Sequence, residues 1–250
     1  EGHPMNEILE SLHRRKSVRV FTDQPVGEVE KRAILEAAVQ APTAGNQQLY
    51  TILDITDQSI KDTLAETCDH QPFIAKAPVV LVFCADCRKW FDAYVEAGCS
   101  PRRPGPGDLM LAVEDAAIAA QNAVTAADSL GLGSCYIGDI MEQHEAHREL
   151  LHLPPWVFPA VMLVLGYPTQ QQKDRPKPER AAMEHVVHSN TYRRMDGEEL
   201  RRIFDGRTGG EEFCSWMQAF HRRKYDSGFA REMNRSVQAY LRDLEEEEPV

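Results

Sequence analysis

The sequence has no apolar run near the roughly 20 residues that a membrane-spanning helix requires. It also has no excess of positive charge, because 28 Lys and Arg residues face 39 Asp and Glu residues, for a formal net charge of −11. Nonspecific binding to nucleic acid or to an anionic membrane needs a basic surface. We therefore expect neither nucleic acid nor a membrane among the partners of this chain.

Familiar catalytic and nucleotide-binding motifs are missing as well. The chain contains neither a Gly-x-Ser-x-Gly nucleophile motif nor a Walker loop. Gly131-Leu132-Gly133 leads towards Gly138, but these glycines follow a predicted helix and open a predicted strand. A Rossmann glycine motif has the opposite polarity, following a strand and opening a helix, so we reject that type of site.

The cysteines do not have the spacing of a disulfide scaffold; they lie at positions 68, 84, 87, 99, 135 and 214. No hydrophobic signal core begins the chain, so we expect reduced thiols and a cytoplasmic location. Met5 is the expected native start, and residues 1–4 are the expected remnant of cloning. Cys84-Ala-Asp-Cys87 has redox or zinc spacing but stands alone after a strand-like run, which favours a buried strand end over either alternative.

Two histidine pairs have helical spacing, His144 with His147 and His185 with His188. A metal site would need a third ligand at a suitable position, and the sequence suggests none. We interpret these histidines as polar surface residues, with metal binding as the alternative.

Hydrophobic periodicity predicts alternating helices and strands. Helices are expected at 6–13, 28–40, 59–67, 108–130, 198–204, 213–223 and 230–244, and strands at 50–55, 78–84, 134–137 and 160–165. An extended segment is expected at 18–21, irregular loops at 41–48 and 100–107, and a polar crossing segment at 170–180. This order indicates an α/β or α+β domain with a helical C-terminal extension. The final glutamates, 245–248, are expected to be solvated.

A knot of positive charge lies near the start of this acidic chain. Arg14, Arg15, Lys16 and Arg19 fall within six residues, with Ser17 among them. Guanidinium groups form bidentate hydrogen bonds with phosphate oxygens, and a serine hydroxyl can donate a further hydrogen bond. The knot therefore predicts a site for a small phosphorylated ligand. The alternative is a solvated helix end, because cations near a helix C-terminus complement its dipole.

Two other polar segments accompany the knot: the loop 42–48 and the crossing segment with Lys177 and Arg180. Together the three segments offer cations, small hydroxyls, carboxamides and free backbone amides. This mixture would suit a ligand with a phosphate at one end and a polar heterocycle at the other.

Several of these segments resemble the nitroreductase family of FMN-dependent NAD(P)H oxidoreductases. The matching motifs, in the order of the family, are Arg15-Lys16-Ser17-Val18-Arg19 with Phe21-Thr22, Gln40 to Gln48, Ala119 to Ala123, Leu130 to Gly138, Leu165 to Pro168, and Lys177-Pro178-Glu179-Arg180. The resemblance covers about residues 7–192, and the helical extension is similar to that of the larger flavin-reductase branch.

The resemblance assigns the charged residues to parts of FMN. Arg15 and Ser17 would hold the phosphate, with either Lys177 or Arg180 closing on it. Arg19 would lie by the pyrimidine edge near N1 and O2. Reduction places negative charge there, so a fixed cation raises the flavin potential.

The other cofactor-binding residues that the resemblance implies are Lys16, Pro42, Thr43, Ala44, Asn46, Gln71, Tyr136, Ile137, Gly138 and Asp139. Residues 42–44 would come from the partner subunit, and Asn46 and Gln71 would offer amides to the ribityl chain or the pyrimidine. Tyr136 to Gly138 would pack beside the ring, with an N–H of Gly138 or Asp139 facing N5. Asp139 departs from relatives that have a second glycine, which leaves acceptor preference open.

The resemblance implies an α+β fold of three α/β/α layers, with a mostly antiparallel central sheet and a C-terminal helical extension. It divides the chain into an FMN-binding domain at 5–192 and an extension with an acidic tail at 193–250. It also implies a homodimer with FMN at the subunit interface.

The implied activity is ping-pong reduction of quinones, nitroaromatics or free flavin by NADPH or NADH. No catalytic side chain is needed, because the cofactor carries the chemistry. The loop 100–107 or the segment 207–210 would cover the site and contact a nicotinamide phosphate. The alternatives are a flavin store or sensor without turnover and a binder of another phosphorylated metabolite.

Overall fold

The structure is a computed structural model that describes residues 4–245. The chain forms two compact units: one comprises the residues up to Arg175 together with those from Glu232 onward, and the other comprises Pro176–Arg231. The expected cloning remnant, apart from Pro4, and the glutamates at 246–248 lie outside the described residues. The domain boundary at 192 was inferred from the family resemblance and stays a prediction.

The first unit is built on a four-stranded sheet. Its strands are β1 (Tyr50–Asp54), β2 (Val79–Asp86), β3 (Gly133–Ile137) and β4 (Val157–Gly166). They are ordered β1-β2-β4-β3, and every neighbouring pair is antiparallel. The two central strands, β2 and β4, are buried along almost their whole length, whereas β3 lies at an edge. The predicted antiparallel sheet is confirmed.

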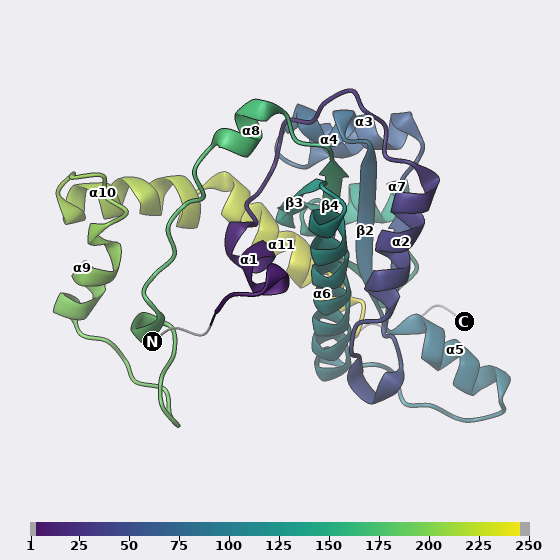
Figure 1. Ribbon diagram of the computed structural model, residues 1–250. Coiled ribbons are helices and arrows are strands. Elements are labelled where there is room, and N and C mark those ends of the chain that lie inside the picture. Colours follow the sequence, from purple (N-terminus) through teal and green to yellow (C-terminus); the bar gives the residue numbers. More distant parts are fainter. Residues whose placement is uncertain (1–3, 246–250) are drawn as a thin grey trace. The chain divides into compact units, whose positions relative to one another are not determined.

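Helices cover both faces of this sheet (Figure 1). On β2, Leu81 and Phe83 belong to one hydrophobic core, while Val80 and Val82 belong to a second, as the alternation of side chains along a strand requires. The first core contains residues of α2 (Glu28–Val39) and α6 (Pro106–Ser129), and the second contains residues of α3 (Gln58–Thr67) and α4 (Pro72–Lys76). The three layers expected from the family resemblance are therefore present.

The predicted helices and strands all occur, with ends shifted by a few residues. The other helical elements of the first unit are α1 (Glu7–Arg14), η1 (Ala44–Asn46), α5 (Arg88–Glu96), η2 (Gly138–Met141), α7 (His144–Leu150) and α8 (Gln170–Asp174). The sequence patterns did not predict α4, α5 or α8. Two of them have five residues each, and α5 buries none of its own residues, so the apolar periodicity that marks a helix is weak there. No helix among residues 4–245 is both long and apolar enough to cross a membrane.

The segment that follows α1 runs along the exposed edge of β3. Ser17 forms a parallel bridge with Ser134, and Phe21 forms an antiparallel bridge with Pro168 beyond β4. The backbone N–H of Val18 donates to the carbonyl of Ser134 at 2.9 Å. The predicted extended segment is thus present, and it holds the basic knot against the sheet edge.

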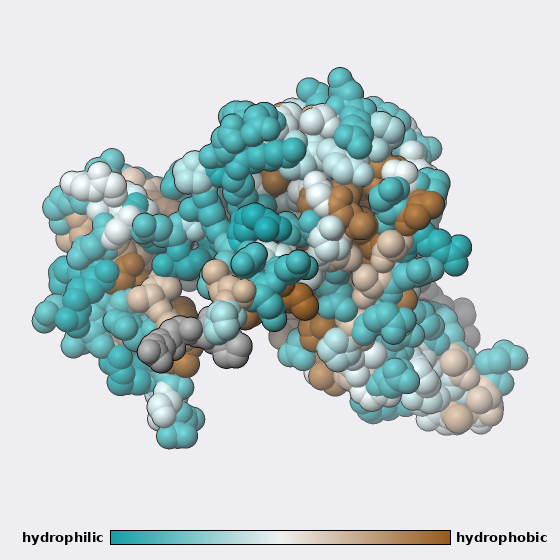
Figure 2. Space-filling model, viewed as in Figure 1, coloured by the Kyte–Doolittle hydropathy of each residue, from teal (hydrophilic) through white to brown (hydrophobic). Residues whose placement is uncertain are grey.

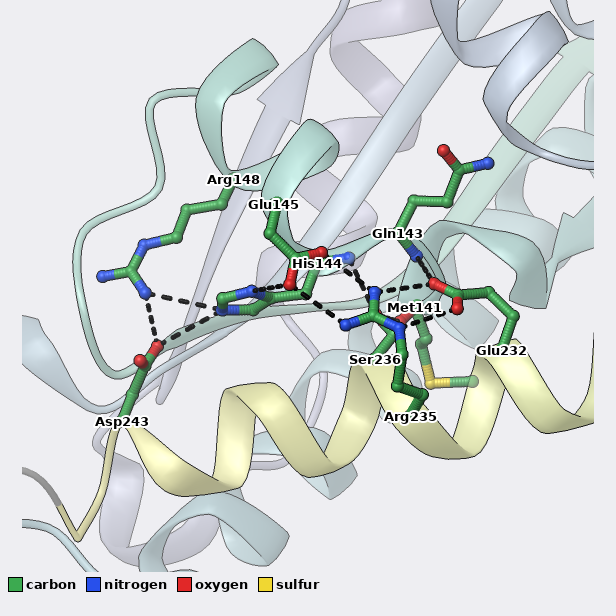
Figure 3. A network of polar contacts seen from close by, with 9 residues as sticks. All are labelled: Met141, Gln143, His144, Glu145, Arg148, Glu232, Arg235, Ser236 and Asp243. Carbon is green, nitrogen blue, oxygen red and sulfur yellow. Dashed lines mark hydrogen bonds and ion pairs between the residues drawn. The ribbon is translucent and has the colours of Figure 1, made fainter.

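The C-terminal part of α11 (Gly228–Arg242) holds the segment that follows β3 (Figure 3). Ser236 Oγ donates to the carbonyl of Met141 at 2.7 Å and accepts from the N–H of His144 at 2.9 Å. Arg235 makes a bidentate ion pair with Glu145, at 3.0 and 2.9 Å. These contacts fasten η2 and the start of α7 to the end of the chain.

The second unit contains η3 (Met183–His185), α9 (Gly197–Asp205), α10 (Phe213–Phe220), the π-helical turn η4 (His221–Tyr225) and the first turn of α11. Asp196 caps α9 in a reciprocal capping box with Glu199. Trp216 stacks on Phe220 with ring centroids 5.0 Å apart. The expected helix at 213–223 ends its α-helical part at Phe220.

Candidate functional site

A cavity of about 350 Å³ opens beside the basic knot, a volume typical of small-ligand sites. Its lining comes from the knot, the end of α6, the start of β3 and α8, namely Arg14, Arg15, Lys16, Val18, Asp128, Gly131 to Ser134, Pro168, Gln172 and Lys173. Four cations in this lining face one carboxylate, so the cavity favours an anionic ligand.

Arg15 is the cation most firmly built into this site. Its guanidinium donates to Ser134 Oγ at 3.1 Å and lies 5.7 Å from the centroid of the Tyr136 ring. Burial raises the pKa of Tyr136 to about 12, although the charge of Arg15 acts against that shift. Arg15 therefore lies beside β3, lining the cavity and contacting both Ser134 and the ring of Tyr136.

Gly133 allows the knot to lie this close to the sheet. A β-carbon at this position would come within 2.6 Å of Val18 Cγ2 and 2.7 Å of Val18 Cβ. Val18 is buried, so it has little room to move. The glycine at the start of β3 is therefore a packing requirement of the site.

The remaining cations of the knot have separate partners. Arg14 pairs with Asp128 of α6 at 2.9 Å, and its side chain is 65% exposed, which agrees with the helix-end interpretation for this residue alone. Lys16 Nζ donates to the carbonyl of Lys173 at 2.6 Å and also to that of Arg175. Lys16 thus ties α8 to the knot, a structural role beside the expected contact with the cofactor.

Arg19 is exposed and projects from the same segment. Its backbone N–H donates to Gln172 Oε1 at 3.1 Å. The charges of Arg15 and Arg19 lower the pKa of the Cys135 thiol, but its burial is the larger effect and raises that pKa. Arg15 and Arg19 therefore both lie close to the middle of β3.

The far end of β3 leads to the other predicted residues. Ile137 is buried, and Gly138 is exposed, with nothing within 4 Å of the place where a β-carbon would stand. Gln71 Nε2 donates to Asp139 Oδ2 at 2.8 Å and to the carbonyl of Cys68 at 2.7 Å. Both amide protons of Gln71 are thus used within the chain, leaving its oxygen for a ligand. Asp139 is turned towards Gln71 and partly buried.

The loop with the other predicted residues lies against α6. Asp115, a buried carboxylate in this Ala-rich helix, accepts from the hydroxyl of Thr43, from the N–H of Ala44 at 3.0 Å and from the N–H of Leu49 at 3.1 Å. None of the residues 42–46 lines the cavity beside the knot. Within one described chain, the structure therefore keeps this loop apart from Arg15 and Ser17.

Lys177 and Arg180 belong to the second compact unit. Arg180 is exposed, and its guanidinium donates to the carbonyl of Pro178 at 3.3 Å. The expectation that one of these two residues closes on a phosphate stays a prediction. The first unit offers two other cations from the same stretch of sequence: Lys173 lines the cavity, and Arg175 donates to the carbonyl of Ser17.

Residues that sequence reasoning missed include Ser134, Gln172 and Asp115. Ser134 and Gln172 look like ordinary polar residues, and only chain folding brings them to the knot. Asp115 carried a usable signal, because a lone carboxylate in an otherwise apolar helix must be paired when it is buried.

The histidine interpretation was wrong for His147, which is fully buried. Its Nδ1 lies 2.9 Å from the carbonyl of Ile140, and its Nε2 lies 2.7 Å from Thr67 Oγ1. Burial lowers the pKa of this imidazole, so the neutral form is favoured. Cys84 lies in β2 and Cys87 one residue beyond it, and burial raises the pKa of both thiols to about 12.

A larger cavity, of about 540 Å³, lies between the 42–48 loop, α5 and the segment 99–104. Trp90, Phe91 and Tyr94 give it an aromatic wall. The guanidinium of Arg102 is bound by both carboxylate oxygens of Asp108, at 2.6 and 3.0 Å, so its charge is neutralised. The cavity beside the knot is the better candidate for an anion because its cations outnumber its carboxylates.

Comparison with known proteins agrees with this arrangement. Residues 12–167 match the model of the nitroreductase family. The chain is 34% identical over 226 residues to an FMN reductase [NAD(P)H] of Bacillus subtilis, covering 86% of this chain and 90% of that protein. It is 37% identical over 199 residues to an oxygen-insensitive NADPH nitroreductase of Salmonella typhimurium, covering 79% of this chain and 80% of that protein.

Solved structures agree in fold. The NfrA1 nitroreductase from B. subtilis superposes with a TM-score of 0.80 at 28% sequence identity, covering 94% of this chain and 98% of the other. The matched region contains the knot, the 42–48 loop, all four strands and Gly138. This chain therefore belongs to the nitroreductase family.

Proposed function

We propose that this chain is an FMN-dependent oxidoreductase that uses NADPH or NADH to reduce quinones, nitroaromatics or free flavin. The observation that carries the proposal is the cationic cavity at Arg15, continued along β3 to the open backbone at Gly138. Curated relatives named as an FMN reductase and an NADPH nitroreductase support the same activity.

The residues present fit FMN. The phosphate would lie in the cavity that Arg15 and Lys173 line, where guanidinium and ammonium groups suit its oxygens. Ser17 lies between the lining residues Lys16 and Val18 but does not itself line the cavity, so its hydroxyl contact stays a prediction. Gly138 is the first residue after β3, four residues beyond Ser134, so about 13 Å of extended chain separates the cavity from the open glycine. A long, flat cofactor would lie along this edge, with Tyr136 and Ile137 beside its ring and Arg19 towards its pyrimidine.

When bound, FMN would supply the hydride chemistry of both half-reactions. The protein would bind the phosphate, orient the ring against β3 and place positive charge near the pyrimidine. Arg19 suits the last of these tasks, because it lies close enough to influence the Cys135 thiol on the middle of β3, while Arg15 is assigned to the phosphate. Positive charge there stabilises the reduced, anionic flavin.

The homodimer with FMN at its interface is part of this proposal. Exposed large apolar side chains lie on α1 (Ile8, Leu9 and Leu12) and on α6 (Met110, Leu111 and Ile118). Figure 2 shows hydrophobic surface over α2 and α6. A second copy covering these helices would bring its own loop 42–46, since this loop does not reach the cavity of its own chain. A cytoplasmic location is also proposed, since all six cysteines are free thiols.

Flavin spectroscopy tests the activity. The purified protein, reconstituted with FMN if needed, is expected to be yellow and to be bleached by NADPH or NADH without oxygen. Adding a quinone or a nitroaromatic should then restore the absorbance. Failure to bind FMN would exclude the proposal, and a bound flavin that NAD(P)H cannot reduce would favour a store or sensor. Initial rates with both donors against a quinone, a nitroaromatic and FMN would rank the substrates.

A further inference from the structure

A buried carboxyl group follows the open Gly138 by four residues, at the end of the turn η2. Glu142 follows η2 and is only 5% exposed. Its Oε1 atom is buried, and no donor within residues 4–245 reaches it. Burying an ionised carboxylate without a hydrogen-bond donor costs free energy. Glu142 must therefore hold a proton itself or share one with a neighbouring group.

The neighbour of Glu142 is another carboxyl group. The side chain of Asp139 lies within hydrogen-bonding distance of Glu142 and is fixed on its other side by Gln71 Nε2, at 2.8 Å. Two carboxylates cannot hydrogen-bond to each other, whereas a carboxylic acid can donate to a carboxylate. Asp139 and Glu142 can therefore form a hydrogen bond when the pair holds one proton.

The other ionisable groups around Glu142 reinforce this state. Asp69, from the turn after α3, and Glu232, from α11, add negative charge. Cys68, at the end of α3, is a buried neutral thiol, and His147, on α7, is favoured as a neutral imidazole. Burial, followed by the charge of Asp139, raises the pKa of Glu142 to about 8.

The two carboxyl groups of the pair differ in exposure. Glu142 is buried, Asp139 is partly buried and Gly138 is exposed, so exposure increases towards the place where the ring and the acceptor are expected. The bonds of Ser236 to Met141 and His144 hold this segment in position.

We propose that Glu142 and Asp139 form a proton-sharing pair that supplies one proton per turnover to a two-electron acceptor reduced at this site. The inference rests on the proposed function. A quinone becomes a hydroquinone by gaining a hydride, which carries both electrons, and one further proton. The shared proton moves from Glu142 to Asp139 as Asp139 passes a proton to the acceptor oxygen, so the pair loses one proton in all and is left with both carboxyl groups ionised. A proton from bulk solvent then restores the singly protonated pair.

Infrared spectroscopy of the flavin-free protein tests the pair independently of activity. The carbonyl stretch of a protonated carboxyl group is expected at about pH 7 and should be lost at higher pH, above the pKa of about 8. Glu142→Gln should remove the band. Glu149→Gln, which replaces an exposed carboxylate on α7, should leave it intact. A wild-type protein without the band, or a band that survives in Glu142→Gln, would overturn the proposal.

Half-reaction kinetics test the use of the proton. General acid catalysis contributes about 10²- to 10⁴-fold, so Glu142→Gln should slow reoxidation of the reduced holoenzyme by a quinone at least tenfold. Reoxidation by ferricyanide, which takes electrons without a proton, should be unchanged. Equal slowing with both acceptors would overturn the proposal. Failure of NADPH to bleach the flavin would refute the proposed function instead, while the infrared band would still report on the pair.

Thermal unfolding provides a further readout, with a defined sign. The folded state holds the Glu142 proton more tightly than the unfolded chain, in which the pKa is near 4.5. The stability that this proton gives the folded state is therefore fully present below pH 4.5 and is lost as pH rises towards about 8. The melting temperature of the wild type, measured against Glu142→Gln, should fall between about pH 5 and pH 9. If the melting temperature of the wild type minus that of Glu142→Gln stays constant or rises with pH, the shared proton is contradicted.

Discussion

Arg14 and Arg15 are adjacent in sequence but have different surroundings. Arg14 extends into solvent from the last turn of α1 and pairs with Asp128, whereas Arg15 is half-buried against Ser134 and Tyr136. An exposed ion pair contributes little, while a positioned guanidinium on a phosphate makes a strong charge-assisted hydrogen bond. The basic knot is thus divided between the surface contact of Arg14 and the proposed binding contact of Arg15.

This division predicts unequal effects on cofactor affinity. Arg15→Ala should weaken FMN binding to the apoprotein about 10- to 100-fold, because a hydrogen bond to a charged group is worth about 1.5–3 kcal/mol. Arg14→Ala is the matched control and should change the affinity by no more than a few fold. Quenching of flavin fluorescence during titration measures both constants. Equal losses in the two variants would contradict the assignment of the phosphate to Arg15.

At the scale of elements, β3 has a crowded start and an open end. Gly133 is packed against Val18, while the position of a β-carbon at Gly138 meets nothing within 4 Å. The same residue type therefore serves two purposes on one edge strand. The first glycine allows the knot to approach the sheet, and the second keeps the backbone accessible.

Alanine substitutions should separate these purposes. Gly133→Ala should cost about 1–3 kcal/mol of stability through overpacking, which lowers the melting temperature by several degrees. Gly138→Ala should retain the wild-type melting temperature but weaken FMN binding, because its methyl group would project where the ring is expected. Thermal scans of the apoprotein and flavin titrations distinguish the two. A large loss of stability in Gly138→Ala would show that its open space is not a ligand surface.

The C-terminal helix acts on the same edge. Helical periodicity predicted α11, but no pattern in the sequence indicates which other elements its side chains contact. In the structure Ser236, Arg235 and Glu232 bond to η2 and α7, almost 100 residues earlier in the chain. These contacts with α11 hold in place the segment that carries Gly138 and Asp139.

At the scale of the whole molecule, one described chain does not bring all the predicted cofactor-binding residues to one cavity. The loop 42–46 is held by Asp115 on α6 and does not line the cavity beside the knot. Exposed apolar side chains on α1 and α6 are the kind of surface that a second copy covers. The proposed dimer would therefore tie the oligomeric state to cofactor binding.

Ile118→Glu should disrupt the proposed dimer and lower the flavin content, because it places a charge in an apolar contact of α6. Ile118 is 41% exposed in one chain, so the variant should fold. Thr63→Glu, an exposed position on α3 across the sheet from α6, is the control and should remain dimeric. Light scattering coupled to gel filtration measures the mass. A fully flavinated Ile118→Glu monomer would contradict an interfacial site.

The sequence by itself determined the order of the strands and of most helices and the location of the basic knot, and the order of the family motifs indicated the antiparallel α+β fold. These features depend on local periodicity, turn residues and motif order, all of which are carried by neighbouring residues. The contacts of Lys16, the buried place of His147 and the partnership of Glu142 with Asp139 were not readable in this way. Only the tertiary structure decided them, because burial and long-range pairing determine which polar groups lose water and must share protons or hydrogen bonds.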